Sequence, residues 1–118
     1  MADGDEIAGQ GALMDPRIER LEAVIRARKG ADPASSYVAA LFSKGTAKIA
    51  QKVGEEATET IIAALREGPE KLTSEAADLL FHLAILLADA GLSLDHILQE
   101  LERREGTSGI DEKANRKG

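Results

Sequence analysis

The sequence predicts an all-α protein, built as a bundle of four to five helices. Ala and Leu dominate its apolar residues, which favours helices over strands. Aromatic residues make up only 3% of the 118 positions, and apolar residues recur every three or four positions over most of the chain. A chain of this length fits one domain with one core.

Composition and charge exclude several classes of protein. The net charge of −6 argues against a general nucleic-acid-binding protein, and the absence of cysteine rules out disulfides and thiolate metal sites. No apolar run approaches the ~20 residues of a membrane-spanning helix. The acidic N-terminus lacks the features of a secretory signal, so we expect a cytoplasmic protein. We expect a disordered extension over residues 1–14, a helical domain over residues 15–105 and a polar tail over residues 106–118.

Two helices are expected in the first part of the domain. The first begins at Asp15-Pro16, because Asp suits the N-cap and Pro suits the first helical position, and it ends near Gly30. The second is short and covers residues 37–42, with a cap supplied by Asp32-Pro33 or by Ser35.

The third helix is expected over residues 46–66, capped by Thr46 and ended by Gly68-Pro69. At about 100° per residue its apolar residues fall on one side. They are Ile49, Val53, Ala57, Ile61 and Ala64. Acids and lysines share the flank of this apolar stripe, namely Lys48, Lys52, Glu56 and Glu59.

The fourth helix begins at Pro69 or Thr73, ends near Ala90 and is apolar almost all round over residues 79–88. A helix that is apolar on every side is buried on every side, and a chain of this size can hardly surround it alone. The sequence therefore predicts a homodimer, or a higher homo-oligomer, with this helix at the shared core. A fifth, amphipathic helix is expected after a cap at Ser93.

Two pairs of acids stand at helical spacing: Glu56 with Glu59, and Glu75 with Asp78. Residues three apart on a helix lie on one face, about 5–6 Å from each other. If the two helices face each other, four carboxylates converge, and such a group needs a cation to offset its repulsion. Oxygen ligands favour Mg²⁺, with Mn²⁺ as a second choice, over zinc. Because Mg²⁺ also binds substrate phosphates, the acids predict a phosphorylated substrate.

A simpler explanation exists for some of these acids. Acids at this spacing are common on solvated helix faces, where Glu56 would pair with Lys52 for only ~0.2–0.5 kcal/mol. That explanation suits Glu55 taken alone. The solvated-face explanation is weaker for Glu75 and Asp78, because they lie directly before the apolar part of the fourth helix.

Sequence motifs typical of di-iron proteins, kinases, dehydrogenases and triad hydrolases are absent. A di-iron bundle uses Glu-x-x-His, but the residues three before His82 and His96 are Leu79 and Ser93. The sequence contains no Walker loop and no G-x-G-x-x-G, so neither a kinase nor a dehydrogenase is indicated. No Ser–His–Asp or Cys–His arrangement is suggested.

Three lysines, Lys44, Lys48 and Lys52, recur every four residues and share one helix face if the helix begins early enough. By themselves they indicate a solvated basic stripe, but beside an acidic metal site they become candidate phosphate-binding residues. His82 lies one turn after Asp78 and is a further candidate for substrate binding. A histidine in such a position more often supports the core or a metal ligand.

The order of the acids, Glu55-Glu56-x-x-Glu59 followed by Glu75-x-x-Asp78, resembles the E-E-x-x-E…E-x-x-D signature of the MazG-like all-α nucleotide pyrophosphatases. The flanking residues resemble more narrowly the phosphoribosyl-ATP pyrophosphatases of histidine biosynthesis. The stretches that carry this resemblance are residues 36–45, 48–56, 74–83, 104–109 and 112–114. The resemblance covers about residues 17–116.

This resemblance implies Mg²⁺-dependent hydrolysis of 1-(5-phosphoribosyl)-ATP to 1-(5-phosphoribosyl)-AMP and pyrophosphate. It implies catalytic roles for five acids, of which four bind the metal and Glu55, or another free carboxylate, accepts a proton from the attacking water. The four metal ligands would be Glu56, Glu59, Glu75 and Asp78, and the phosphates would be held by Lys44, Lys48 and Lys52. Two alternatives stay open: a house-cleaning pyrophosphatase for dUTP or damaged triphosphates, and a non-catalytic helical dimerisation module.

Overall fold

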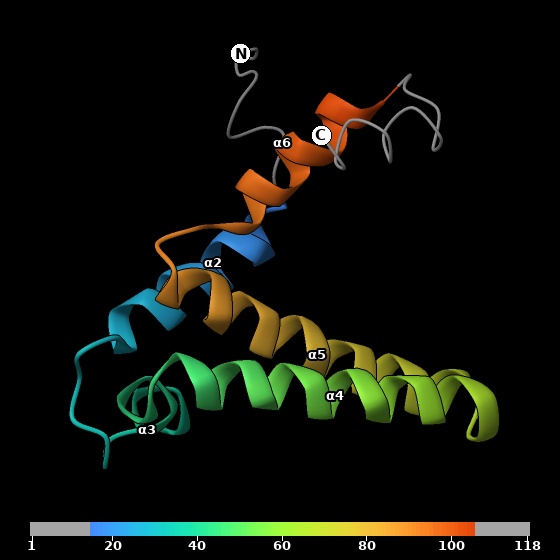
Figure 1. The fold of residues 1–118 in the computed structure, drawn as a ribbon, viewed down its shortest axis with the longest axis horizontal. Coiled ribbons are helices and arrows are strands. Elements are labelled where there is room, and N and C mark those ends of the chain that lie inside the picture. Colours follow the sequence, from blue (N-terminus) through green and yellow to red (C-terminus); the bar gives the residue numbers. More distant parts are fainter. Residues whose placement is uncertain (1–14, 106–118) are drawn as a thin grey trace.

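The computed structural model describes residues 15–105, and this part of the chain contains five α-helices and no strand (Figure 1). They are α2 (Pro16–Arg28), α3 (Tyr37–Lys44), α4 (Thr46–Arg66), α5 (Pro69–Asp89) and α6 (Leu94–Arg104). The predicted all-α class is therefore confirmed. The extension over residues 1–14 and the tail over residues 106–118, for which we expect disorder and polar character, lie outside the described residues.

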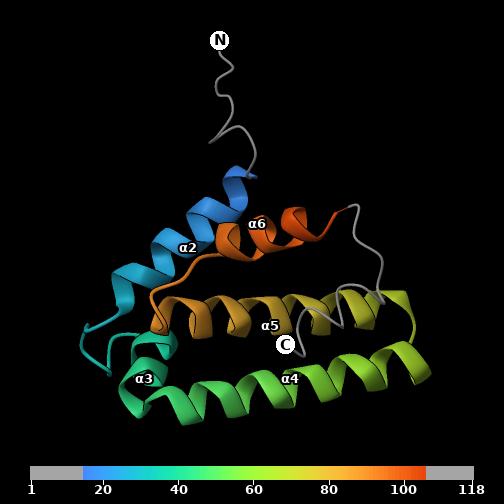
Figure 2. The same ribbon diagram turned by 45° about the horizontal axis from the view of Figure 1, so that its top comes forward.

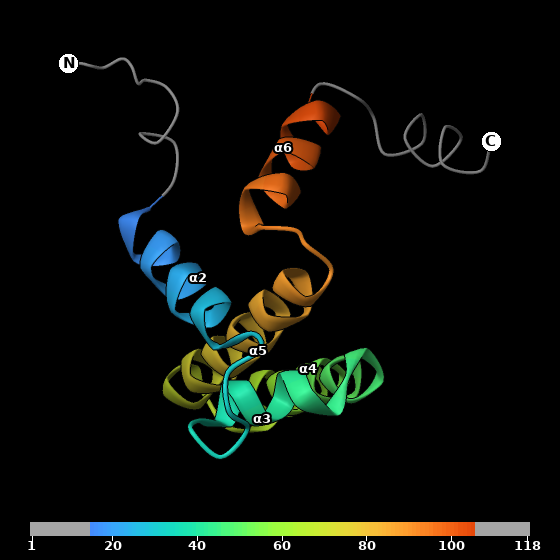
Figure 3. The same ribbon diagram turned by 90° about the vertical axis from the view of Figure 1, so that its left-hand side faces the viewer.

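Helices α4 and α5 form a long antiparallel hairpin that supports the other helices. They lie side by side along their length in both Figure 1 and Figure 2. Helices α2 and α3 pack against the end of the hairpin where α4 begins and α5 ends. Helix α6 leaves from that same end and diverges from α2 (Figure 3). The far half of the hairpin, near its turn, thus has no third helix of the described chain against it.

The hydrophobic core lies at the end of the hairpin that α2 and α3 cover. Three isoleucines have 0% exposure there: Ile25 of α2, Ile49 of α4 and Ile85 of α5. Other buried members of this cluster are Val38, Leu41 and Ala84. Each fully buried side chain of this size contributes roughly 1.5–3 kcal/mol of transfer free energy. The core therefore anchors four helices to one another and holds the near end of the hairpin rigid.

Side-chain caps explain where the first two described helices begin. Asp15 caps α2 as predicted, because its carboxylate accepts the backbone N–H of Arg17 at 2.8 Å. The prediction that Asp32-Pro33 or Ser35 caps the second helix is wrong. Ser36 caps α3, and its hydroxyl accepts the N–H of Ala39 at 3.0 Å.

The break between α3 and α4 is a single glycine. Gly45, and not Thr46, is the N-cap of α4, and its φ of +95° is a conformation that side chains other than glycine's rarely adopt. Lys44 therefore ends α3 instead of starting the next helix. The helix therefore begins too late for Lys44 to share one helix face with Lys48 and Lys52, which was the condition for that prediction.

The apolar stripe predicted along α4 is correct only for the half that faces the core. Ile49 is buried and Val53 is half-buried, but Ile61 is 59% exposed and Ala64 is also exposed. Ala63 takes the buried position instead. The reason is that the far half of α4 packs only against α5, and one neighbour covers a narrower strip than a full core does.

Helix α6 is attached through a buried carboxylate of α2. Glu22 is 9% exposed, and its Oε2 accepts the backbone N–H of Leu94 at 2.7 Å. This contact places a negative charge at the positive N-terminal end of α6. The predicted cap at Ser93 is confirmed, and its N–H donates to Nδ1 of His96 at 3.0 Å.

Within residues 15–105, no single helix is long and apolar enough to cross a membrane. Only α5 and α6 taken together reach that length and composition, and the two are bent by 98° at the break between them.

Candidate active site

The facing surfaces of α4 and α5 bring three of the predicted metal ligands together. Glu56, Glu75 and Asp78 each offer one carboxylate oxygen, and these oxygens all lie within 4.8 Å of one another. Glu75 and Asp78 project from one face of α5, because they are three residues apart, and Glu56 meets them from α4. We call these three residues the carboxylate cluster.

Two members of the carboxylate cluster are buried. Glu56 and Glu75 are each 7% exposed, whereas Asp78 is exposed. Glu56, which was predicted on the flank of the apolar stripe, is thus covered by the contact between α4 and α5. Burial makes an unpaired carboxylate costly by several kcal/mol, so the cluster requires positive charge nearby.

The buried carboxylate of Glu75 has one oxygen without a partner. Its Oε2 forms an ion pair with Nζ of Lys71 at 3.1 Å, but its Oε1 has no hydrogen-bond partner among the described residues. An unsatisfied buried oxygen costs roughly 1–3 kcal/mol. A divalent cation among the three carboxylates would satisfy it, and a donor set of carboxylate oxygens suits a hard ion such as Mg²⁺.

The fourth predicted ligand, Glu59, lies beside the cluster and not within it. Its side chain is exposed and lies close to the carboxyl group of Glu75. The neighbouring carboxyl group of Glu75, together with the negative charge of Glu56, raises the pKa of Glu59. Glu59 is therefore an acid that takes up a proton more readily than its exposed position alone would suggest.

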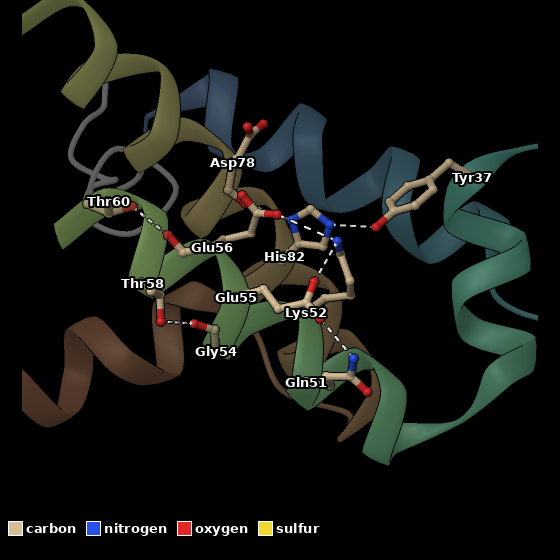
Figure 4. Close-up of polar contacts among 10 residues, drawn as sticks. All are labelled: Tyr37, Gln51, Lys52, Gly54, Glu55, Glu56, Thr58, Thr60, Asp78 and His82. Carbon is tan, nitrogen blue, oxygen red and sulfur yellow. Dashed lines mark hydrogen bonds and ion pairs between the residues drawn. The ribbon is translucent and has the colours of Figure 1, made fainter. Parts of the chain in front are cut away.

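Lys52 is the predicted lysine that reaches the carboxylate cluster (Figure 4). Its Nζ lies 3.1 Å from Oε1 of Glu55 and 3.6 Å from Oε2 of Glu56, and the hydrogen bond with Glu55 raises its pKa. Hydrogen bonds from Gln51 and Lys52 lower the pKa of Glu55, which lies on the exposed side of α4. Lys48 lies one turn earlier on α4.

His82 is buried, and both of its ring nitrogens have partners in the protein. Nδ1 lies 2.8 Å from the backbone carbonyl of Asp78, which can only accept, so Nδ1 carries the proton. In the neutral ring Nε2 then accepts the hydroxyl proton of Tyr37 at 2.7 Å (Figure 4). These contacts favour a supporting role for His82 over direct contact with a substrate, because they tie α3 to the turn of α5 that carries Asp78.

Two residues near the cluster are absent from the sequence-based predictions. Lys71 stands four residues before Glu75, and that spacing on one helix could have identified it. Tyr37 contacts His82 from another helix, 45 residues away, and no local pattern indicates that contact. Desolvation raises the pKa of Tyr37, and the nearby acid Glu56 adds to the shift.

Comparison with known proteins agrees with this geometry. Residues 18–105 match a family model described as phosphoribosyl-ATP pyrophosphohydrolase. A phosphoribosyl-ATP pyrophosphatase of Erythrobacter litoralis is 63% identical over 99 residues, which cover 84% of this chain and 95% of that protein. Proteins with the same name from Rhizorhabdus wittichii and Zymomonas mobilis are 59% and 60% identical, over 87% and 88% of this chain and 97% of each relative.

Proposed function

Because the chain belongs to the phosphoribosyl-ATP pyrophosphohydrolase family, we propose roles for its site residues in the reaction of that family. The enzyme hydrolyses 1-(5-phosphoribosyl)-ATP to 1-(5-phosphoribosyl)-AMP and pyrophosphate in histidine biosynthesis. One observation carries the assignment of the site: three carboxylates each bring an oxygen within 4.8 Å of the others. A buried oxygen of Glu75 that has no partner within residues 15–105 supports it. A cytoplasmic location is part of this proposal.

Glu56, Glu75 and Asp78 would hold Mg²⁺, or Mn²⁺ in its place, with Glu59 at the margin of the site. The ion, when bound, supplies Lewis-acid stabilisation of the charge that develops on the phosphates. The three carboxylates, two of them buried, hold their oxygens close together before binding. Such preorganisation means that little rearrangement of the protein is needed to bind the ion.

The reaction breaks the bond between the α-phosphorus and the oxygen that bridges to the β-phosphate, as water adds to the α-phosphorus. A carboxylate must accept a proton from that water. Between the two exposed acids of α4, Glu59 suits this role better than Glu55. Glu59 lines a hollow together with Glu75, whereas the carboxylate of Glu55 accepts hydrogen bonds from Gln51 and Lys52.

Lys52 would bind a substrate phosphate, since its ammonium lies beside Glu56 and its side chain is one-quarter exposed. Lys48, one turn earlier, would add positive charge along the same helix. Lys44 is the last residue of α3, so it would contact a phosphate from a different helix than Lys48 and Lys52 do. Because Lys52 already touches the cluster, we expect its replacement to raise KM more than that of Lys48 or Lys44.

The experiment that tests the function is phosphorus NMR of the products formed from phosphoribosyl-ATP, with and without Mg²⁺. We expect pyrophosphate and phosphoribosyl-AMP to form only with the metal, and ATP and dUTP to be poor substrates. Efficient release of pyrophosphate from dUTP would assign the site to house-cleaning hydrolysis instead. No turnover of any nucleotide would contradict catalysis and favour a dimerisation module.

We also propose that the protein forms a homodimer through α5. Leu80 of α5 is 38% exposed in the single chain, and Ile62 and Leu65 of the neighbouring α4 are 44% and 77% exposed. Leu80→Glu is expected to convert a dimer into a monomer, because it would bury a charge in an apolar contact. Light scattering after size-exclusion chromatography measures this, with Ala23→Glu on the exposed side of α2 as the control. A Leu80→Glu protein that stays dimeric would place the contact elsewhere.

A further inference from the structure

Lys71 links the carboxylate cluster to solvent. Its Nζ lies 3.1 Å from Oε2 of Glu75, and the two residues are one turn apart on α5. The side chain of Lys71 is 52% exposed, whereas that of Glu75 is 9% exposed. The ion pair therefore joins a buried carboxylate to an ammonium group whose side chain is half exposed.

An open hollow lies beside this ion pair. Its volume is about 260 Å³, and its lining residues are Glu59, Ile62, Glu67, Lys71 and Glu75. The hollow is open to solvent, so a ligand can enter it from the surface. The lining includes three acids, so a phosphate can enter only when a cation offsets their charge.

The antiparallel arrangement of α4 and α5 places one lysine at each end of the cluster. Along α4 the order is Lys52, Glu56 and then Glu59, and along α5 the facing order is Asp78, Glu75 and then Lys71. Lys52 contacts Glu56 at one end, and Lys71 contacts Glu75 at the other. A chain of phosphates lying over the cluster would thus meet an ammonium group at both ends.

We propose that Lys71 is a further substrate-binding residue, which pairs with Glu75 in the free protein and binds the departing pyrophosphate when the metal is present. Glu75 would share its charge with a divalent cation bound at the cluster, and its attraction for Lys71 would then be weaker. The exposed ammonium of Lys71 would be able to pair with phosphates in the hollow instead. This inference rests on the proposed function and names the residue that contacts its leaving group.

The proposal makes two opposite predictions for Lys71→Gln. Without substrate, Mn²⁺ binds several-fold more tightly than to the wild type, because the cation that competes for Glu75 is gone. Inhibition by pyrophosphate weakens roughly tenfold or more, because a charge-assisted contact with the phosphates is lost. Electron paramagnetic resonance of free Mn²⁺ measures the first quantity, and inhibition kinetics at saturating Mg²⁺ measure the second.

Two control variants separate this role from a general effect of charge. Lys71→Arg keeps the charge and is expected to retain most of the pyrophosphate inhibition. Arg66→Gln removes the same charge from the end of α4, where the side chain does not line the hollow, and is expected to change neither quantity.

Unchanged or weaker Mn²⁺ binding by Lys71→Gln, or unchanged inhibition by pyrophosphate, would overturn the proposal and leave Lys71 as a surface ion pair. The Mn²⁺ titration needs no turnover, so it tests the pairing with Glu75 even if the wild type fails to hydrolyse phosphoribosyl-ATP. If the wild type does not hydrolyse phosphoribosyl-ATP, that result contradicts only the proposed function.

Discussion

Replacing Asp78 by Asn, or Glu56 by Gln, is expected to lower kcat by about 10³-fold while the protein stays folded. Both changes keep the size of the side chain and remove one negative charge from the carboxylate cluster. Stabilisation by a bound metal is worth several kcal/mol in the transition state, and each ~1.4 kcal/mol is a factor of ten in rate. A loss of about 4 kcal/mol therefore corresponds to roughly 10³-fold.

The measurement is the rate of pyrophosphate release at several Mg²⁺ concentrations, with circular dichroism to check helix content. Glu70→Gln is the matched control, because Glu70 is an exposed acid in the first turn of α5 and lies outside the cluster. We expect wild-type kcat for this control. Full activity of both Asp78→Asn and Glu56→Gln at limiting Mg²⁺ would show that the cluster does not hold the metal.

Glu75→Gln is expected to have opposite effects on stability and on activity. It should abolish most turnover, yet raise the melting temperature of the metal-free protein. The native carboxylate is buried, one of its oxygens has no hydrogen-bond partner in the part of the chain that the structure describes, and it lies close to Glu56 and Asp78. Gln is nearly the same size, carries no charge, and its amide can donate a hydrogen bond to a neighbouring carboxylate.

The magnitudes favour a net gain in stability. The variant loses the ion pair with the exposed Lys71, which is worth about 0.3–0.5 kcal/mol at this spacing. It gains about 1–3 kcal/mol through relief of the unsatisfied buried oxygen. A net gain of about 1 kcal/mol raises the melting temperature by roughly 4–8 °C in a domain of this size.

Thermal unfolding in a chelator and in millimolar Mg²⁺ tests this. Mg²⁺ is expected to stabilise the wild type, because a ligand that binds only the folded state shifts the equilibrium towards it, and to leave Glu75→Gln unaffected. Glu67→Gln is the control, since Glu67 lines the same hollow but is exposed. A metal-free Glu75→Gln protein that melts below the wild type would refute the idea that this carboxylate destabilises the free fold.

The helices could be predicted from the sequence because their signals are local. Asp15 caps α2, Pro69 begins α5 and Ser93 caps α6, as each residue type favours at its position. The two small errors, at Ser36 and Gly45, also concern local signals, where adjacent residues compete for the same capping role.

The convergence of Glu56, Glu75 and Asp78 was also predictable, because the spacing of each pair sets its face of the helix and the short turn at Gly68 makes the two helices antiparallel neighbours. The position of Glu59 was not. The helical spacing of Glu59 from the residues three and four positions away is the same whether Glu59 lies inside the cluster or at its edge. That difference depends on how α4 is rotated against α5.

The sequence by itself therefore determined the all-α class, the helix bounds within a few residues and the acids that meet on the hairpin, because caps, glycines, prolines and helical spacing act over a few residues. Only the tertiary structure decided which side of each helix is covered. It buried Glu56 and left Ile61 exposed, and it paired Tyr37 with His82 across 45 residues. Those outcomes depend on which helices pack where, and packing is a property of the whole chain that no short window of sequence contains.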